Sequence, residues 1–193
     1  MASIQHVYRR GHIFWWRRVL CIFGESSCDI RVSLGTADRR RARKLGAMLT
    51  AASGDVTMLV EERETIVGVQ DLIGVEYART RQVATGSWLG KAYQGHGIGK
   101  EMRAAVLHLA FAGLGAQRAT SEAFEDNAAS LAVSRALGYV ENGDDIKVSR
   151  GRSRRAVRLV LHREVWQKNC RDDMQIQGLE SCVTMFGLDR MDS

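Results

Sequence analysis

The chain has 193 residues, of which 45% are hydrophobic and 26% charged, and its formal net charge is +6. This balance is typical of a soluble globular protein and excludes a disordered chain, and the length suits one sizeable core. No stretch reaches the roughly 18 uninterrupted apolar residues of a membrane span, and arginines interrupt the amino terminus where a signal peptide would be plainly apolar. We therefore expect a cytoplasmic protein.

The basic residues are concentrated at the amino terminus. Residues 1–50 carry ten Lys and Arg against three Asp and Glu, whereas the rest of the chain is close to neutral. Residues 7–23 are aromatic and β-branched, and residues 28–34 place apolar side chains at alternate positions. The pattern predicts two or three short strands with a hairpin connection at residues 24–27.

A basic helix is expected next. Ala42, Leu45 and Leu49 recur at helical spacing within residues 37–52, and Thr36 or Asp38 can cap the start. Ser53, Gly54 and Asp55 then form the best boundary in a chain that has no proline. We expect residues 1–55 to form a separate basic hairpin-and-helix segment.

This first segment resembles the amino-terminal arm of phage-type tyrosine recombinases. The resemblance rests on Tyr8-Arg9-Arg10-Gly11, Trp15-Trp16-Arg17-Arg18, Arg31 to Thr36 and Asp38 to Arg43. It implies contact with DNA through residues 1–50, because arginines and aromatic rings bind a phosphate backbone. The interpretation we favour is simpler: the tryptophans pack and the basic helix has a solvated face.

The remaining elements follow the order β-β-β-α-β-α-β-β. Strands are expected at residues 56–60, 65–72, 83–89 and 119–124, with helices at 100–113 and 127–137 and a final pair of strands at 146–148 and 156–161. Met102, Val106, Leu109 and Ala110 give the first helix one apolar face, and Gly138 ends the second helix. The fold class is α+β, with a mixed, mostly antiparallel sheet flanked by helices.

A glycine-rich turn lies between the third strand and the first helix of this unit. Gly95, Gly97 and Gly99 stand at alternate positions, and the helix that follows presents unpaired N–H groups and the positive end of its dipole. Such a turn binds phosphate. The glycines follow neither the dinucleotide spacing G-x-G-x-x-G nor the P-loop spacing, since Gln94 replaces the first P-loop glycine and Glu101 replaces its Ser or Thr.

The turn fits the pattern [QR]-x-x-G-x-[GA] through Gln94, Gly97 and Gly99. It resembles the pyrophosphate loop of the GCN5-related N-acetyltransferases, the GNAT family. A second motif, Asn127-x-x-Ser130 followed by Leu137-Gly138-Tyr139, is similar to the branch that acetylates protein amino termini and related amines. The resemblance covers residues 56–166, and residues 167–193 look like a carboxy-terminal extension of some members.

The resemblance implies acetyl-CoA as the cofactor, an amine as the acceptor and no metal. It implies that backbone amides near Trp88, Leu89 and Gly90 meet the acetyl oxygen and the pantetheine arm. The loop residues Gln94, Gly95, His96, Gly97, Ile98, Gly99 and Lys100 would hold the pyrophosphate. Asn127 and Ser130 complete the cofactor site, with the Asn127 side chain on the pantetheine arm.

The acid and the base are candidates only. Many members carry Tyr seven residues after the asparagine as general acid, but here that position is Ser134, whose alternative role is a small helix residue bonded to the preceding turn. Glu122 and Glu125 are candidate bases because an attacking amine must lose a proton.

Two functions therefore stay open. The first is direct transfer of an acetyl group to a small amine or a peptide amino terminus in a ternary complex. The second is a weakly active CoA-binding unit fused to a DNA-binding-like segment, because the family's first strand and two helices are missing from the prediction. An unpaired edge strand near Val56 would favour a homodimer.

Overall fold

The computed structural model describes residues 65–181 and 183–188, with side chains from Val67 onward except at residues 177, 181, 184 and 185. Before them it describes only the backbone of seven strands: β1 Tyr8–Arg10, β2 Ile13–Trp15, β3 Leu20–Cys21, β4 Ser27–Cys28, β5 Arg31–Val32, β6 Lys44–Thr50 and β7 Asp55–Glu62. The aromatic and basic side chains expected to contact DNA, and residues 37–43 of the expected basic helix, lie outside the described residues.

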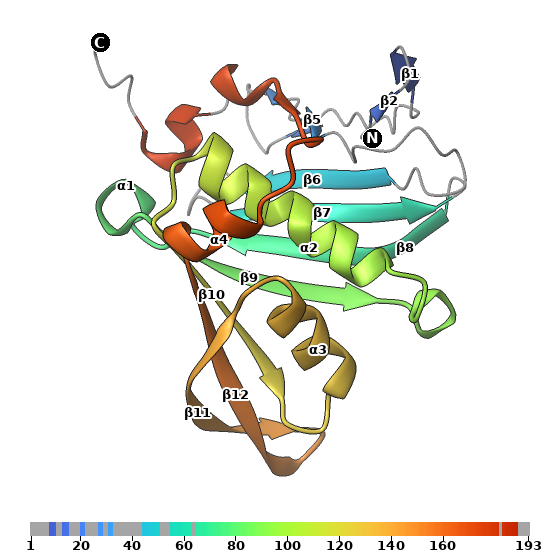
Figure 1. Ribbon diagram of the computed structural model, residues 1–193, viewed down its shortest axis with the longest axis vertical. Coiled ribbons are helices and arrows are strands. Elements are labelled where there is room, and N and C mark those ends of the chain that lie inside the picture. Colours follow the sequence, from blue (N-terminus) through green and yellow to red (C-terminus); the bar gives the residue numbers. More distant parts are fainter. Residues whose placement is uncertain are drawn as a thin grey trace.

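One seven-stranded sheet organises the molecule, in the order β11-β12-β10-β9-β8-β7-β6 (Figure 1). Its later strands are β8 Thr65–Ile73, β9 Gln82–Leu89, β10 Arg118–Phe124, β11 Val140–Ser149 and β12 Arg152–His162. All neighbours are antiparallel except β9 and β10, which are parallel because a helix connects them. The predicted α+β class with a mixed, mostly antiparallel sheet is confirmed.

The prediction of a helix over residues 37–52 is wrong for the part of this range that the structure describes. Lys44–Thr50 is strand β6, and it pairs antiparallel with β7 over its whole length. Leu45, Ala47 and Leu49 also fit the two-residue period of a strand, so the apolar pattern allowed both states. Pairing with the sheet satisfies the exposed edge of β7, which outweighs a weak helix propensity. The edge expected to be unpaired near Val56 is therefore covered.

The amino-terminal hairpins are only partly as expected. β1 pairs with β2, and Leu20–Cys21 pairs with Ser27–Cys28 across the predicted connection. β5 instead pairs with β13 Ile176–Gln177, near the carboxyl end of the chain. At the other end of the sheet, the strands expected at residues 146–148 and 156–161 are β11 and β12, which are longer than predicted because the turn between them is only Arg150-Gly151, both at positive φ.

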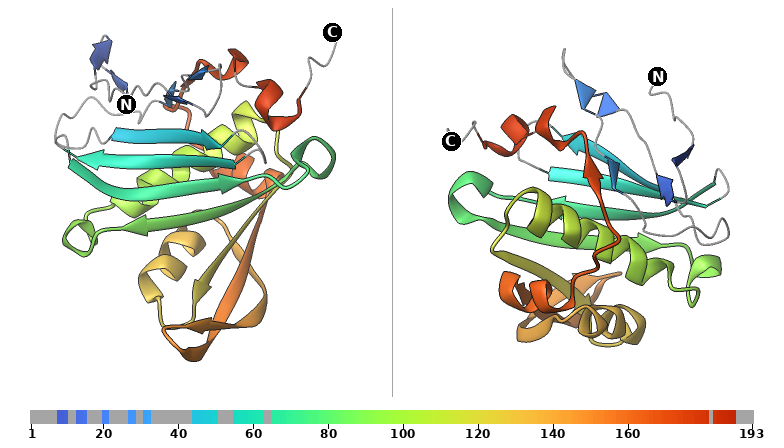
Figure 2. Two further views of the ribbon diagram at one scale, coloured as in Figure 1. Left: turned by 180° about the vertical axis from the view of Figure 1, so that it is seen from behind. Right: turned by 45° about the horizontal axis from the view of Figure 1, so that its top comes forward.

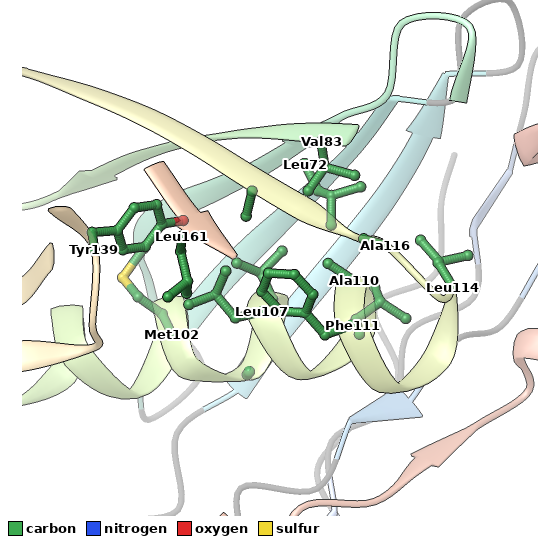
Figure 3. Close-up of a cluster of buried hydrophobic side chains, with 14 of the residues drawn as sticks. Leu72, Val83, Met102, Leu107, Ala110, Phe111, Leu114, Ala116, Tyr139 and Leu161 are labelled. Carbon is green, nitrogen blue, oxygen red and sulfur yellow. The ribbon is translucent and has the colours of Figure 1, made fainter. Parts of the chain in front are cut away.

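Helix α2 Ile98–His108 crosses one face of the sheet and continues into a π-helical turn, Leu109–Gly113. Its predicted apolar face is confirmed, because Met102, Val106, Leu109 and Ala110 are buried. Figure 3 shows Met102 and Ala110 of this face near Leu72 and Val83 of the sheet and Tyr139 beyond α3, and Val106 and Leu109 belong to the same buried cluster. The tyrosine hydroxyl of Tyr77 closes the far end by donating to the Leu114 carbonyl at 2.9 Å.

The other side of α2 is covered by the end of the chain (Figure 2). Trp166 of α4 Arg163–Asn169 stacks on Phe111 with ring centroids 5.1 Å apart, and Phe186 meets Tyr77 edge to face. Short segments complete the fold: α1 Tyr77–Thr80, α3 Ala128–Ala136 and the 3-10 turns Lys91–Tyr93, Leu179–Ser181 and Val183–Phe186. No helix in the described part of the chain is long and apolar enough to cross a membrane.

Candidate functional site

The two central parallel strands separate part-way along their length. β9 and β10 pair from Gln82 with Arg118 to Thr85 with Ser121, and beyond that point β9 continues to Leu89 without a β10 partner. We call residues 86–89 the open end of β9. Figure 1 shows β10 turning away from β9 toward the β11–β12 hairpin.

Side-chain hydrogen bonds hold the strands together where the opening begins. The Ser121 hydroxyl donates to the Thr85 carbonyl at 2.9 Å, and the Thr85 hydroxyl donates to the Thr120 carbonyl at 3.2 Å. The Tyr139 hydroxyl lies 3.0 Å from the Thr85 hydroxyl. Burial raises the pKa of Tyr139, an effect opposed by this hydrogen bond and by the charge of Arg103. The cluster therefore stays neutral and fixes the point of separation.

The phase of β9 decides which backbone groups face the opening. The sequence predicts that the Gly90 amide binds the cofactor. In the structure this amide donates to the Val67 carbonyl at 2.8 Å, so it is already engaged within the sheet. Because antiparallel pairing alternates, Trp88 also turns its amide toward β8, whereas Ser87 and Leu89 turn theirs toward the open side. The sequence motif located this strand but not its phase, and Ser87, which faces the opening, was not among the predicted site residues.

The glycine-rich turn directly follows the open end. Gly95 and Gly97 have φ of 77° and 80°, and a Cβ at either would meet no heavy atom within 4 Å, so left-handed backbone is what requires glycine. The Gln94 side chain donates to the Leu89 carbonyl at 3.0 Å and ties the turn to the strand. His96 and Lys100 are exposed, and Ile98 is buried below them.

A cavity of about 310 Å³ joins the turn to the open end of β9. Its lining comes from β9, the turn, α2 and α3: Ser87, Leu89, Gln94, Gly95, Gly97, Gly99, Lys100, Arg103, Asn127, Ala129, Ser130 and Val133. A smaller cavity of about 130 Å³ adjoins it toward β10 and is lined by Ser87, Arg103, Glu122, Ala123, Phe124, Asn127, Ser130 and Ala156. Four residues line both: Ser87, Arg103, Asn127 and Ser130.

Asn127 and Ser130 are fixed by the start of α3. The Asn127 carboxamide oxygen accepts from the Ser130 amide at 3.2 Å, which caps the helix. At the other end, the amides of Gly138 and Tyr139 donate back to Arg135 and Ser134 carbonyls, and Gly138 has φ of 93°. The predicted role of Gly138 as a helix stop is confirmed, and both predicted cofactor residues line the cavity.

Comparison with known proteins identifies the family. The model of the acetyltransferase (GNAT) domain matches residues 30–140, more than half of the chain. The chain belongs to the GNAT family. The family match and the sheet both extend to the amino-terminal side of the boundary expected at residue 55.

Solved structures share the GNAT fold at low sequence identity. A probable acetyltransferase is 22% identical with a TM-score of 0.55, over 58% of this chain and 64% of that one. A spermidine/spermine N-acetyltransferase from Vibrio cholerae is 17% identical with a TM-score of 0.56, over 62% and 74%. A ribosomal-protein-S5-alanine acetyltransferase from Vibrio fischeri is 20% identical with a TM-score of 0.54, over 58% and 63%. The first and third matches thus span less than two thirds of those chains.

Ser134 takes the position where many GNAT members have a tyrosine, but its hydroxyl is buried and engaged. It donates to the Ser130 carbonyl at 3.0 Å and accepts from Arg103 at 2.5 Å. Ser134 lines neither of the two cavities. This geometry agrees with the alternative role of a helix residue bonded to the preceding turn, and gives no support to a role as acid.

The two candidate bases differ in position. Glu122 lines the smaller cavity, where its carboxylate pairs with the ammonium group of Lys147 from β11. Glu125 lines neither cavity and forms an ion pair with Arg155 at 3.3 Å. Arg155 also forms an ion pair with Asp144 at 3.1 Å. Glu122 is therefore the carboxylate placed near the open end of β9. Within the described residues, no group of three or more His, Cys, Asp or Glu could hold a metal ion.

Arg103 is a second cavity-lining residue, besides Ser87, that the sequence reasoning missed. Its guanidinium donates to the hydroxyls of Ser87 at 2.7 Å and Ser134 at 2.5 Å, and only 3% of the residue is exposed. Burial lowers the pKa of Arg103, and Tyr139 opposes the change. The signal was present: Arg103 precedes Val106 by three residues and Ala110 by seven, so it is a charge on the buried face of α2.

Proposed function

We propose that this protein is an acetyl-CoA-dependent N-acetyltransferase that acts on primary amines by direct transfer in a ternary complex. One observation carries the proposal: a phosphate-type glycine turn and the open end of a β-strand line the same cavity. A ligand with a pyrophosphate and an extended amide-bearing arm matches both parts, because the turn suits the phosphates and the strand offers unpaired backbone groups.

Particular groups of the cavity support acetyl-CoA as the ligand. The amides of Lys100 and Glu101 bond back to the Gly97 carbonyl at 3.1 Å, and the amides before them in the first helical turn have no partner within the helix. They would hold the pyrophosphate, with the positive end of the α2 dipole behind them. The open side of β9 at Ser87 and Leu89, together with Asn127, would bind the pantetheine arm. Acetyl-CoA supplies the acetyl group as an activated thioester.

Glu122 would accept the proton of the acceptor amine, directly or through water. Its carboxylate lines the cavity next to Ser87 and Arg103, whereas Glu125 is drawn into the ion pairs of the β11–β12 hairpin. The incoming amine carries a positive charge before it loses its proton, so it would take the place of the Lys147 ammonium group beside the Glu122 carboxylate.

The family and its structural neighbours support an amine as the acceptor. Those neighbours include enzymes named for spermidine and spermine and for the alanine of ribosomal protein S5. Both kinds of acceptor present a primary amine, so a small polyamine and a peptide amino terminus are the two classes to test. DNA contact through residues 1–50, a homodimer and a cytoplasmic location stay predictions, and a salt-dependent gel shift with duplex DNA tests the first.

A thiol-release assay tests the function. The protein is mixed with acetyl-CoA and, separately, spermidine, spermine and peptides with free amino termini, and the free thiol of CoA is followed over time. We expect release that depends on an amine and falls at least tenfold in Asn127→Ala, which loses both the cap and the cavity amide. Asn169→Ala, on α4 outside this cavity, is the matched control. Acetyl-CoA binding without release from any acceptor would contradict the enzyme assignment.

A further inference from the structure

Arg103 is a buried cation with no anionic partner among the described residues. Its two hydrogen bonds go to the neutral hydroxyls of Ser87 and Ser134, and its Nε is buried without an acceptor. A buried charge is costly unless an opposite charge or strong hydrogen bonds compensate it. The arginine therefore has unused capacity to stabilise negative charge.

The position of Arg103 shows where such a charge would arise. Arg103 and Ser87 line both cavities, at the place where α2 approaches the opening between β9 and β10. The glycine turn follows the carboxyl end of β9, and Ser87 lies further back along the open end of that strand. A ligand held in the turn by its pyrophosphate and lying along residues 86–89 would therefore bring its other end to Ser87. In CoA, that other end is the sulfur.

Ser87 offers a proton at this point. It is exposed in the opening, and its oxygen accepts the hydrogen bond from Arg103. A hydroxyl that accepts from a cation is polarised and becomes a stronger donor through its own hydrogen. The Ser134 hydroxyl differs, because its hydrogen is already donated to the Ser130 carbonyl.

We propose that Ser87 and Arg103 form the site that stabilises the CoA sulfur as it leaves, with Ser87 donating to the sulfur and Arg103 positioning and polarising that hydroxyl. This inference rests on the proposed function. In the transfer step, the amine nitrogen forms a bond to the acetyl carbon, the carbon–sulfur bond breaks and its electron pair stays on sulfur. The amine proton passes to Glu122 or to water, and the products are the acetylated amine and a thiolate held by the pair.

The proposal makes a binding prediction that needs no acceptor. A site that favours thiolate lowers the pKa of the bound CoA thiol below the ordinary thiol value of about 8.5. CoA binding should then strengthen as pH rises from the bound-state pKa to the free pKa, by about tenfold for each unit of lowering. Acetyl-CoA has no thiol to titrate and serves as the reference.

Other titratable groups near the sulfur position also change their charge with pH, and their contribution cancels in the ratio of the CoA affinity to the acetyl-CoA affinity. They are Glu122 from β10 with its partner Lys147 from β11, Lys100 from α2 and Tyr139 beyond α3. Each affects CoA and acetyl-CoA alike to first order. The informative quantity is therefore the affinity for CoA divided by that for acetyl-CoA at each pH.

The experiment measures both affinities by calorimetry from pH 6 to pH 9 in the full chain. We expect the ratio to rise at least tenfold with pH, to stay flat in Arg103→Met, and to recover part of its rise in Arg103→Lys. Ser87→Ala, at an exposed position where folding is not at risk, should reduce the rise at least threefold. The ultraviolet absorbance of the thiolate should appear in the CoA complex below pH 8 and be lost in Arg103→Met.

A ratio that is flat or falls with pH in the unaltered protein would overturn the inference while leaving acetyl-CoA binding intact. Failure of the protein to bind acetyl-CoA at all would instead overturn the proposed function. A rise that survives unchanged in both Arg103→Met and Ser87→Ala would place the thiolate elsewhere and also overturn the inference.

Discussion

Two polar clusters lie on either side of the point where β9 and β10 separate, and they differ in how well they are satisfied. On the paired side, the hydroxyls of Thr85, Ser121 and Tyr139 all have protein partners at 2.9 to 3.2 Å. On the open side, Arg103 carries a full charge, has only neutral partners and leaves Nε without one.

We interpret this difference as that between a structural role for the Thr85 cluster and the ligand-binding role proposed for Arg103. Buried polar groups that serve the fold are hydrogen-bonded within it, because an unmet donor or acceptor costs free energy. The Thr85 cluster follows this rule and fixes the geometry of the opening. Arg103 departs from it next to a cavity, and such departures are expected where a ligand completes the interactions.

The largest effect is expected from Gly97→Val, which perturbs the ligand side and leaves both clusters untouched. A β-branched residue at φ of 80° is strained by about 1–2 kcal/mol, and its side chain would enter the cavity. We expect acetyl-CoA affinity to fall roughly 30- to 150-fold, or about 2–3 kcal/mol, by calorimetry. Gly151→Val in the β11–β12 turn, at φ of 72°, has the same strain away from the cavity and should keep its affinity. Equal losses in both variants would contradict a phosphate role for the turn.

The second change, Thr85→Val, breaks the satisfied cluster. It leaves the buried Tyr139 hydroxyl without its partner, which costs about 1–3 kcal/mol of unfolding free energy. Urea unfolding followed by tryptophan fluorescence measures the loss. Thr120→Val removes a hydroxyl whose one described bond is to the Val83 carbonyl at 3.3 Å, and it should cost less. A Thr85→Val protein as stable as the unaltered one would show that the cluster is not structural.

The third change, Arg103→Met, tests the cluster on the open side, where Arg103 has only neutral partners, by the same urea unfolding. Replacing a buried charge with an apolar side chain of similar length removes a desolvation cost and two hydrogen bonds, so the effects offset. We expect the unfolding free energy to change by no more than about 1 kcal/mol. A loss above about 3 kcal/mol would show that Arg103 serves the fold, and would remove the contrast with Thr85.

The smallest effect concerns His108, on another side of α2. Burial lowers its pKa below 6.5, although Asp173 opposes the shift. As pH falls through 6.5 the unfolded chain gains a proton that the folded protein resists, so stability declines until the folded-state pKa is passed; above 6.5 the residue has no such effect. His108→Phe should flatten the decline in unfolding free energy between pH 6.5 and pH 5. An unchanged slope would assign acid sensitivity to other groups.

The sequence predicted the order of the main strands and of the helices α2 and α3 between Thr65 and His162 because the signals for these elements are local. The glycine turn, the Asn127 cap, the Gly138 stop and the apolar stripe of α2 each follow from a few neighbouring residues. The strand β6 was missed because its residues suit both periods, and the choice depends on the distant edge of β7. Such pairing is a tertiary effect that a local pattern does not contain.

The candidate site divides in the same way. Motifs located the turn and Asn127, but the phase of β9 depends on its register with β8, which turned Gly90 away and Ser87 toward the opening. Ser134 was singled out by its position in the motif, yet the hydrogen bond to Ser130 engages its proton. Arg103 required knowledge of what surrounds it, since a single charge on an apolar helix face is visible in the sequence but its lack of an acid is not.

The central claim is that CoA binds with its sulfur beside Ser87, and disulfide trapping tests it most directly. Ser87→Cys and Trp88→Cys are each incubated with oxidised CoA, and the mixed disulfide is located by peptide mass spectrometry, which separates it from any adduct on the native cysteines. Trp88 is 62% exposed and on the opposite face of the strand, so simple accessibility favours it. Binding as proposed predicts modification at least ten times faster at position 87. Equal rates, or faster modification at position 88, would contradict it.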